Sequence, residues 1–463
     1  MELDQSALHF QALSAYHNPH VDKKTSGELP VSFCPGKKTL LEKLRQVPLP
    51  QDLDTLISID YEGEVPAEAV GLEQTEVDAI WSDAVALYRT GMYPLLSVCL
   101  RREGKMLLNR TIGYQRGDAQ SSDAVIADLK TPICLFSASK SISAMLLHLL
   151  AEQGKIHLLD PISYYIPAFG ANGKGDISVY QLLAHRAGVP GLGEDVDPAL
   201  LFDHQAALEQ ICAAEPIDHL GRTIAYHAIT GGFVLDELIR VTTGMNAQQY
   251  LNKYIRKPMG MRYFRYGLTK RDQARVADHR STGFKPGKII GGTLKNALGI
   301  DLEEAVTLSD TPEFRSALLP SGNIYCTAEE AGRFFQMMLD YGLYEDKQIL
   351  QPLTVHRSIQ ETGKAVIDAS LKVPMRYSPG FMLGGSPVGI YGRNSHYAYG
   401  HLGLSTVLCW ADPERDISVA ILNTGKPVLG NHLRALPRLL FGIADRCPPV
   451  REMPAETAQL IAV

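Results

Sequence analysis

Apolar positions in the first third of the chain switch between a helical and a strand period. From Glu76 to Thr90 they recur at the spacing of an amphipathic helix. Two short apolar runs, 95–100 and 105–108, flank the turn-forming stretch 102–104 and predict a β-hairpin. A second helix follows Phe136; its apolar stripe faces a core, and it ends at Gly154.

The pattern changes twice more towards the C-terminus. Residues 158 to about 300 read as mainly helical, with many Gly and Pro interruptions, and another helix is expected from Glu329 to Tyr341. Strands are predicted at Thr406–Trp410 and Ile417–Asn423, and a last helix from about Gly430 to Ala444. Strands early and late predict an α/β (α+β) fold: an antiparallel sheet flanked by helices, built from both chain ends, with a mainly helical inserted lobe.

This pattern divides the chain into three parts. Residues 76–157 and 308–463 form the predicted sheet domain, and residues 158–307 the mainly helical domain. Residues 1–75 carry repeated prolines and mixed charge, with one helix expected at about Lys37–Val47. They read as an N-terminal extension, either a partial lid or a loosely ordered arm.

Composition narrows the class of protein. With 463 residues, 45% hydrophobic and 21% charged, the chain is an ordinary globular protein too long for one small core. A net charge of -6 argues against nucleic acid and against docking on anionic lipid. The seven cysteines lack C-x-x-C spacing, so neither a zinc site nor a disulfide framework is expected. No metal or cofactor is implied. Without a secretory signal or a bilayer-spanning run, we expect a cytoplasmic protein without membrane insertion; a homo-oligomer is left open.

One tetrad carries candidate chemistry. Ser137 and Lys140 form an S-x-x-K sequence at the start of the second helix, where the i, i+3 spacing brings the amine to the hydroxyl. A serine there also gains from unpaired N–H groups and the helix dipole, which would activate it as a nucleophile. Taken alone, the tetrad fits equally an N-cap by Ser137 or Ser139 followed by a solvated lysine.

Two further segments add candidate groups. Tyr226 lies in a turn-like stretch before a helix, and a lysine nearby would lower the pKa of its phenol and make it a general base. The alternative is a half-buried, hydrogen-bonded tyrosine. His401-Leu402-Gly403-Leu404 precedes a strand; its small residues allow a close approach, and an edge strand there offers an N–H to an oxyanion.

In combination these segments resemble a family. Leu182–Pro190 resembles an L-L-x-H-x-S-G-x-P signature, and Lys257–Met261 and Leu319–Asn323 resemble two further landmarks in the right order. The chain thus resembles the serine β-lactamase-like superfamily, which includes class C β-lactamases, penicillin-binding DD-peptidases and family VIII carboxylesterases. The G-x-S-x-G elbow of α/β-hydrolases is absent from the sequence.

The resemblance implies roles for single residues. Ser137 matches the nucleophile, Lys140 its lysine, and Tyr226 the tyrosine of a Y-x-N motif. Leu404 matches the residue whose N–H completes the oxyanion hole with that of Ser137.

Two departures direct the substrate prediction. Ala228 replaces the asparagine of Y-x-N, and His401 replaces the lysine of K-T-G, which His401-Leu402-Gly403 matches. Ala228, His401 and Gly403 are therefore the predicted substrate-binding residues of a site that favours esters of short to medium acids over β-lactams. The expected activity is a serine carboxylesterase with a small-molecule ester as its partner. One alternative is a β-lactamase, amidase or acyltransferase that acts at the same site. The other alternative is a catalytically silent protein that serves as a scaffold.

Overall fold

The computed structural model describes residues 44–192 and 197–450. All of the described residues fall in one compact unit. Most of the helix predicted at Lys37–Val47 lies outside the described residues, and its last residues, 44–47, are not helical. The division into a sheet domain and a helical domain stays a prediction.

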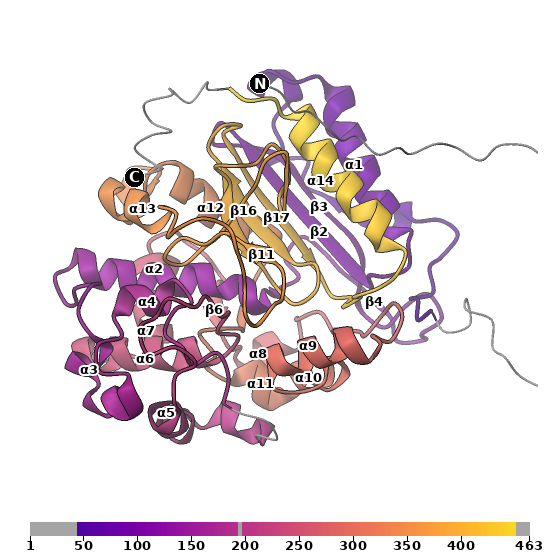
Figure 1. Cartoon of the computed structure of the whole chain (residues 1–463). Coiled ribbons are helices and arrows are strands. Elements are labelled where there is room, and N and C mark those ends of the chain that lie inside the picture. Colours follow the sequence, from indigo (N-terminus) through magenta and orange to yellow (C-terminus); the bar gives the residue numbers. More distant parts are fainter. Residues whose placement is uncertain (1–43, 193–196, 451–463) are drawn as a thin grey trace, which may run out of the picture. The chain divides into compact units, whose positions relative to one another are not determined.

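One antiparallel sheet dominates the fold (Figure 1). Its strand order is β1-β3-β2-β17-β16-β15-β12, and β4 pairs with β3 outside this path. The central strands come from the two ends of the chain, as the sequence predicts, and the family's α/β fold class is confirmed. The strands are β1 (Ile57–Ile59), β2 (Leu95–Arg102), β3 (Lys105–Arg116), β4 (Val125–Ile126), β12 (Met382–Leu383), β15 (Tyr399–Leu402), β16 (Leu408–Asp412) and β17 (Ile417–Asn423).

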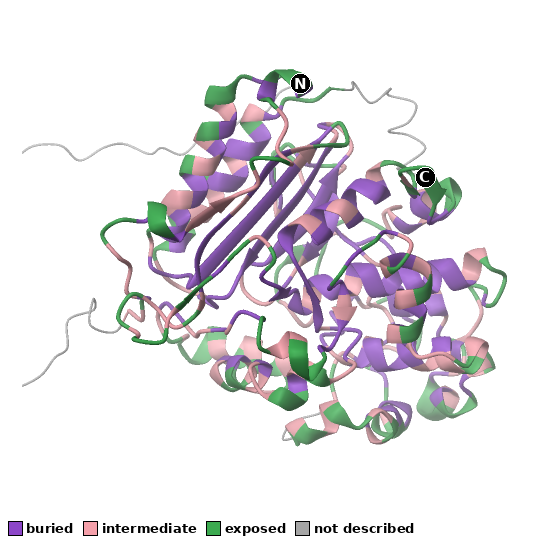
Figure 2. Cartoon of the chain, turned by 180° about the vertical axis from the view of Figure 1, so that it is seen from behind, coloured by how far each residue is buried: buried purple, intermediate pink, exposed green. Residues whose placement is uncertain are grey.

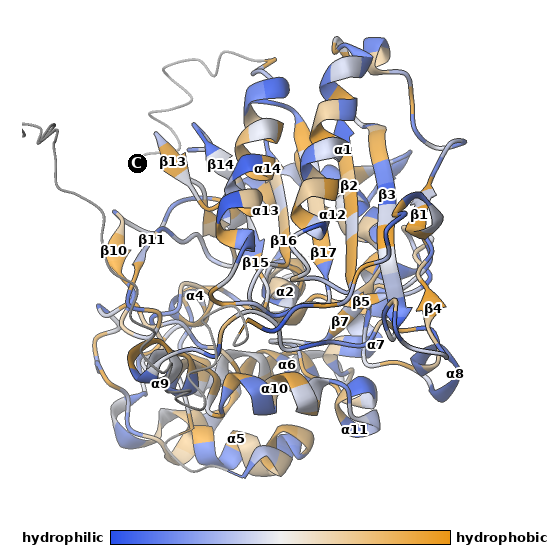
Figure 3. Cartoon of the chain, turned by 90° about the vertical axis from the view of Figure 1, so that its right-hand side faces the viewer, coloured by the Kyte–Doolittle hydropathy of each residue, from blue (hydrophilic) through white to orange (hydrophobic). Residues whose placement is uncertain are grey.

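Both faces of the sheet are covered, because successive side chains of a strand point to opposite sides. On β17, Val419 and Ile421 join the core cluster that includes α1 (Gln74–Tyr88) and α14 (His432–Arg446). Ala420 and Leu422 join the cluster that includes α12 (Ala328–Leu339). The central strands are therefore buried throughout (Figure 2), and hydrophobic positions run along β2 and β17 (Figure 3).

Helices α3 to α11 lie below the sheet in Figure 1. Between residues 158 and 310 the elements are almost all helical, as predicted. The helices are α2 (Ser139–Glu152), α3 (Ile162–Tyr165), α4 (Val179–Leu183), α5 (His204–Ala213), α6 (Thr230–Thr243), α7 (Ala247–Leu251), α8 (Lys270–Gln273), α9 (Lys288–Leu298), α10 (Leu302–Ser309), α11 (Pro312–Ser316) and α13 (Pro352–Ser358). A small sheet joins β5 (Ile133–Cys134), β7 (Ile324–Cys326) and β6 (Arg265–Tyr266), and short hairpins pair β8 (Leu343–Tyr344) with β9 (Lys347–Gln348), β10 (Val366–Ile367) with β11 (Pro374–Met375), and β13 (Val388–Gly389) with β14 (Gly392–Arg393).

Element boundaries differ from the predictions by a few residues. The strand expected from Thr406 begins at Leu408, because residues 403–407 form a tight turn in which Gly403 N–H donates to Val407 O. Strand β15 is not a free edge, since β12 pairs with it at Tyr399 and Gly400. Within the described part of the chain, no helix is long and apolar enough to cross a membrane.

Candidate active site

Ser137 lies in a tight turn between strand β5 and helix α2. The turn is the 3₁₀ segment η4 (Phe136–Ala138), which begins with Phe136 at φ +47°. A bulky residue in this left-handed region is strained, and such strain persists only where the surroundings fix it. The Phe136 ring packs against the His279 ring with centroids 4.8 Å apart, and Lys426 Nζ lies 4.9 Å from its centre. The strained turn thus places Ser137 just before α2.

Neither serine of the tetrad caps the helix. The N-cap of α2 is Ala138, and no side chain hydrogen-bonds there. Ser139 Oγ instead accepts the N–H of Ile324 at 3.0 Å, which ties the helix start to β7. The N-cap interpretation of the tetrad is therefore wrong, and Ser137 Oγ stays available for other contacts.

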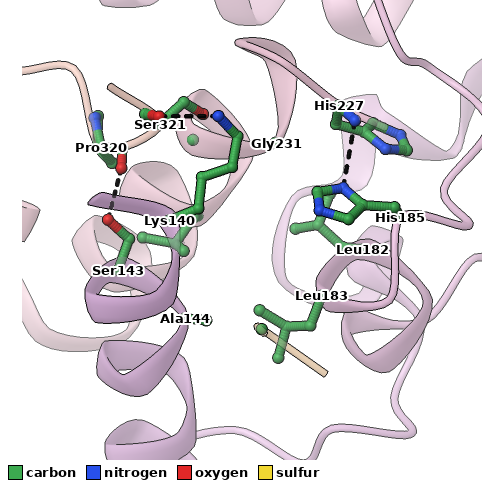
Figure 4. A pocket seen from close by; sticks show the side chains of 13 residues that line it. Lys140, Ser143, Ala144, Leu182, Leu183, His185, His227, Gly231, Pro320 and Ser321 are labelled. Atoms are coloured by element: carbon green, nitrogen blue, oxygen red, sulfur yellow. Dashed lines mark hydrogen bonds between the residues drawn. The ribbon is translucent and has the colours of Figure 1, made fainter. Parts of the chain in front are cut away.

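Lys140 bonds directly to Ser137. Its Nζ lies 3.1 Å from Ser137 Oγ and donates to the main-chain oxygen of Ser321 at 2.8 Å (Figure 4). Burial of the amine lowers the pKa of Lys140 to about 7, because desolvation disfavours the ammonium. A large fraction of Lys140 is therefore neutral near pH 7, where its lone pair can accept the proton of Ser137.

Ser321 holds the Lys140 amine through its main-chain oxygen, a contact that the sequence did not indicate. Its hydroxyl donates to Ile229 O at 2.8 Å, which anchors the residue beside the start of α6. Gly232 makes this approach possible, since a Cβ there would lie 2.4 Å from Ser321 Oγ. In the sequence, Leu319–Asn323 resembles a family landmark, but this resemblance predicts no contact between Ser321 and Lys140.

Tyr226 is buried beside Ser137 and Lys140. Lys140 Nζ lies 4.9 Å from the centre of its ring, and the Tyr226 N–H donates to Asp368 Oδ1 at 3.1 Å. Burial raises the pKa of Tyr226, and a side-chain hydrogen bond with Ser137 opposes this only in part. The expected lowering of this pKa by Lys140 is therefore wrong: the phenol stays protonated. Asp368 was missed, because a single aspartate in an irregular segment carries no sequence signal.

His401 and Gly403 are buried, and neither lines the cavities beside Ser137 and Lys140 that are described below. His401 is buried, its Nδ1 lies 2.7 Å from Leu402 O, and its ring centroid is 6.0 Å from that of Tyr226. Burial lowers the pKa of His401 to about 3, so the imidazole is neutral. A Cβ on Gly403 would lie 2.3 Å from Leu135 O, so this position requires glycine. Both residues pack the site from behind.

His227, the residue beside Tyr226, is also buried. Its main-chain N–H donates to His185 Nδ1 at 3.2 Å, and burial lowers the pKa of His227 to about 4. Both histidines line a cavity of about 420 Å³ next to Lys140 (Figure 4). Because both imidazoles are neutral near pH 7, neither adds a second positive charge beside the Lys140 amine.

A separate pocket of about 710 Å³ opens at Ser137, and we call it the first chamber. Ala228 and Leu404 also line it, as the resemblance predicted for a substrate site and an oxyanion hole. Among the hydrogen bonds of the described residues, the Leu404 N–H has no protein acceptor. The first chamber is lined by Phe136, Ser137, Leu201, Ala228, Ile229, Phe233, Leu298, Ile300, Ala305, Leu308, Phe314, Leu319, Pro320, Ser321, Gly322 and Leu404. None of these residues is charged.

Known proteins resemble the chain over most of its length. The sequence model described as Beta-lactamase matches residues 84–440. "Esterase/beta-lactamase LipL" of Mycobacterium tuberculosis is 28% identical over 311 residues, 62% of this chain and 68% of that protein. A family VIII carboxylesterase aligns with TM-score 0.70 and 23% identity, over 82% of this chain and 99% of that one. A penicillin-binding protein homologue from Caulobacter crescentus also gives 0.70, with 22% identity over 81% and 99%. The two structural likenesses concern the fold.

Proposed function

The chain belongs to the Beta-lactamase family as a hydrolase of that fold, and we propose that it cleaves carboxylic esters through an acyl-enzyme on Ser137. The observation that carries this proposal is the contact between Ser137 Oγ and the Lys140 amine, at 3.1 Å, at the mouth of an uncharged chamber. A nucleophile, a base of suitable pKa and an apolar binding surface then meet at one point.

The proposed reaction begins with a proton transfer. Neutral Lys140 takes the proton of Ser137 Oγ as the oxygen attacks the ester carbonyl carbon, and the carbonyl oxygen becomes an oxyanion. The N–H groups of Ser137 and Leu404 are the proposed donors to that oxyanion; removing one such donor typically costs about 2.7–4 kcal/mol. The bond between the former carbonyl carbon and the alkoxy oxygen then breaks, which restores the carbonyl on the acyl-enzyme, and the departing oxygen takes the proton from the Lys140 ammonium. Water repeats the cycle and releases the acid.

Tyr226 has a different role in this scheme from the one its position first indicated. Because burial keeps its phenol protonated, it donates a hydrogen bond to Ser137 or to the leaving oxygen rather than removing a proton. Lys140, with its pKa near 7, is the proposed base. The Lys140 amine lies 4.9 Å from the centre of the Tyr226 ring, so the two groups meet beside Ser137.

The pocket favours esters over β-lactams. A β-lactam antibiotic carries a carboxylate, and burying it among uncharged side chains without a partner is costly. Ala228 offers a methyl group where an amide would be needed, and His401 is buried and neutral. Because LipL carries both activities in its name, β-lactam cleavage on the same site is the second candidate.

A pair of serine variants tests the proposal. Ser137→Ala should lower kcat for p-nitrophenyl butyrate by about 10⁴–10⁶-fold, because the acyl-enzyme cannot form. Ser139→Ala is the matched control: it loses the bond from Ile324 and some stability, but the folded fraction should retain activity. Nitrocefin measured in parallel reports β-lactam cleavage. Retained ester hydrolysis in Ser137→Ala would contradict the proposal. Absence of hydrolysis in the folded wild type would also contradict it, and that outcome would favour a silent scaffold.

A further inference from the structure

A second apolar pocket adjoins the first chamber. The space between the walls of this second chamber is about 550 Å³, open solvent included, and it shares four lining residues with the first chamber. The shared residues are Leu201, Ile229, Leu298 and Ile300. They come from three separate segments: η6 (Pro198–Phe202), the residue before α6, and the end of α9 with the loop that follows it. The two chambers therefore meet at a collar of four aliphatic side chains.

Polarity is distributed unevenly along this path. At the near end Ser137 and Ser321 supply the polar side chains, and the other side chains of the first chamber are apolar. At the far end the second chamber reaches Asp197 and Asn296, both exposed to solvent. The reactive serine thus lines one pocket, exposed polar residues line the other, and aliphatic side chains line the part that the two share. This arrangement suits a linear aliphatic chain.

Size indicates how long that chain is. A water molecule takes about 30 Å³ in the liquid, and a methylene group is of similar size, so a ten-carbon chain fills on the order of 300 Å³. The space between the walls of the first chamber, about 710 Å³ with the part open to solvent included, exceeds that volume. An acetyl or butyryl group would leave most of the apolar side chains of the chamber without contacts. Water in its place would interact only weakly with these side chains.

We propose that the two chambers bind a linear aliphatic arm of about eight or more carbons on the ester, and that Leu298 gauges its length at the collar. This inference rests on the proposed function and places the preferred chain at the long end of the expected short-to-medium range. The same chemistry fits an acyl chain or an alkyl alcohol, so the experiment varies each separately. Every added methylene that enters an apolar pocket should raise kcat/KM by about fourfold.

The test uses two ester series below their critical micelle concentrations. One is p-nitrophenyl esters of C2 to C12 acids, and the other is acetate esters of C2 to C12 alcohols followed by acid release. Wild type should show a rise in kcat/KM to C8 or beyond in at least one series. Leu298→Trp, which blocks the collar, should lower the C10-to-C2 ratio in that series by at least about tenfold. Leu298→Ala removes contacts and should lower the same ratio by less.

Ile289→Trp provides the matched control on the same helix. Ile289 is 86% exposed and lines neither chamber, so a tryptophan there should leave the ratio unchanged. A flat or falling profile beyond C4 in both series overturns the inference while leaving ester hydrolysis intact. So does an equal effect of Leu298→Trp on C2 and C10. Absence of hydrolysis at every chain length counts against the proposed function instead.

Discussion

Lys140 and Lys426 both reach the short segment Phe136–Ser137, and burial lowers the pKa of each to about 7. Their partners differ. Lys140 Nζ lies 3.1 Å from the hydroxyl oxygen of Ser137 and borders a cavity. Lys426 is fully buried, and its Nζ lies 2.9 Å from the carbonyl oxygen of Asn423 and 4.9 Å from the centre of the Phe136 ring.

The difference shows that a lowered pKa does not by itself identify a general base. A neutral amine needs a group that can give up a proton, and the Ser137 hydroxyl is one. The carbonyl and the ring beside Lys426 only accept donated hydrogens, so that amine has no proton to take. Lys426 instead holds the strained residue that precedes the nucleophile. Geometry separates a base from a positioning group where desolvation alone does not.

The largest expected effect comes from removing each amine in turn. Lys140→Met should lower kcat for a p-nitrophenyl ester by about 10³-fold, within the range for loss of a general base. Lys426→Met keeps the apolar volume under Phe136 and should lower kcat by less than about tenfold. Circular dichroism and thermal melting establish that both variants are folded. A Lys426→Met loss as large as that of Lys140→Met would contradict the assignment.

Sequence reasoning succeeded where contacts are local or periodic. The i, i+3 spacing of Ser137 and Lys140 sets their contact within one helical turn, and the structure has it. The apolar run of β17 is typical of a strand buried on both faces, and its successive side chains join two core clusters, so a sheet strand could be predicted there.

It failed where a contact joins distant segments. Ser321 lies 181 residues from Lys140, and Asp368 lies 142 residues from Tyr226, so no spacing rule connects them. The pKa of Tyr226 was misjudged for a related reason: proximity to a lysine was inferred, but the burial that outweighs it arises only in the folded chain. His401 was assigned to substrate, whereas packing buries it behind Tyr226.

The pH dependence of hydrolysis sharpens the comparison further. If neutral Lys140 is the base, kcat/KM should be constant above about pH 7 and fall about tenfold per pH unit below it, because protonation removes the lone pair. Lys426→Met should keep that limb at the same pH, although the pKa of Lys426 is also about 7. Initial rates from pH 5 to 9 with a permanently neutral ester report it. If the fall in kcat/KM below pH 7 disappears in Lys426→Met, the group that titrates is Lys426 and not Lys140.

Lys426 should also change how the free energy of unfolding depends on pH. Its pKa is about 7 when folded, against about 10.4 for an unperturbed lysine, so between these values only the unfolded chain holds the proton. The unfolded state then binds more protons, and the free energy of unfolding contributed by Lys426 rises with pH by about 1.4 kcal/mol per unit. Below pH 7 both states are protonated and the slope vanishes.

Urea unfolding of wild type and Lys426→Met from pH 6 to 10 measures this slope as a difference between the two proteins. Wild type should gain stability relative to the variant as pH rises from 7 to 10, and the two curves should run parallel below pH 7. The exposed Lys364→Met is the matched control and should run parallel to wild type throughout. Parallel curves for Lys426→Met over the whole range would mean that its amine stays charged in the fold. Both lysines would then be buried, but of the two only Lys140 would be neutral near pH 7.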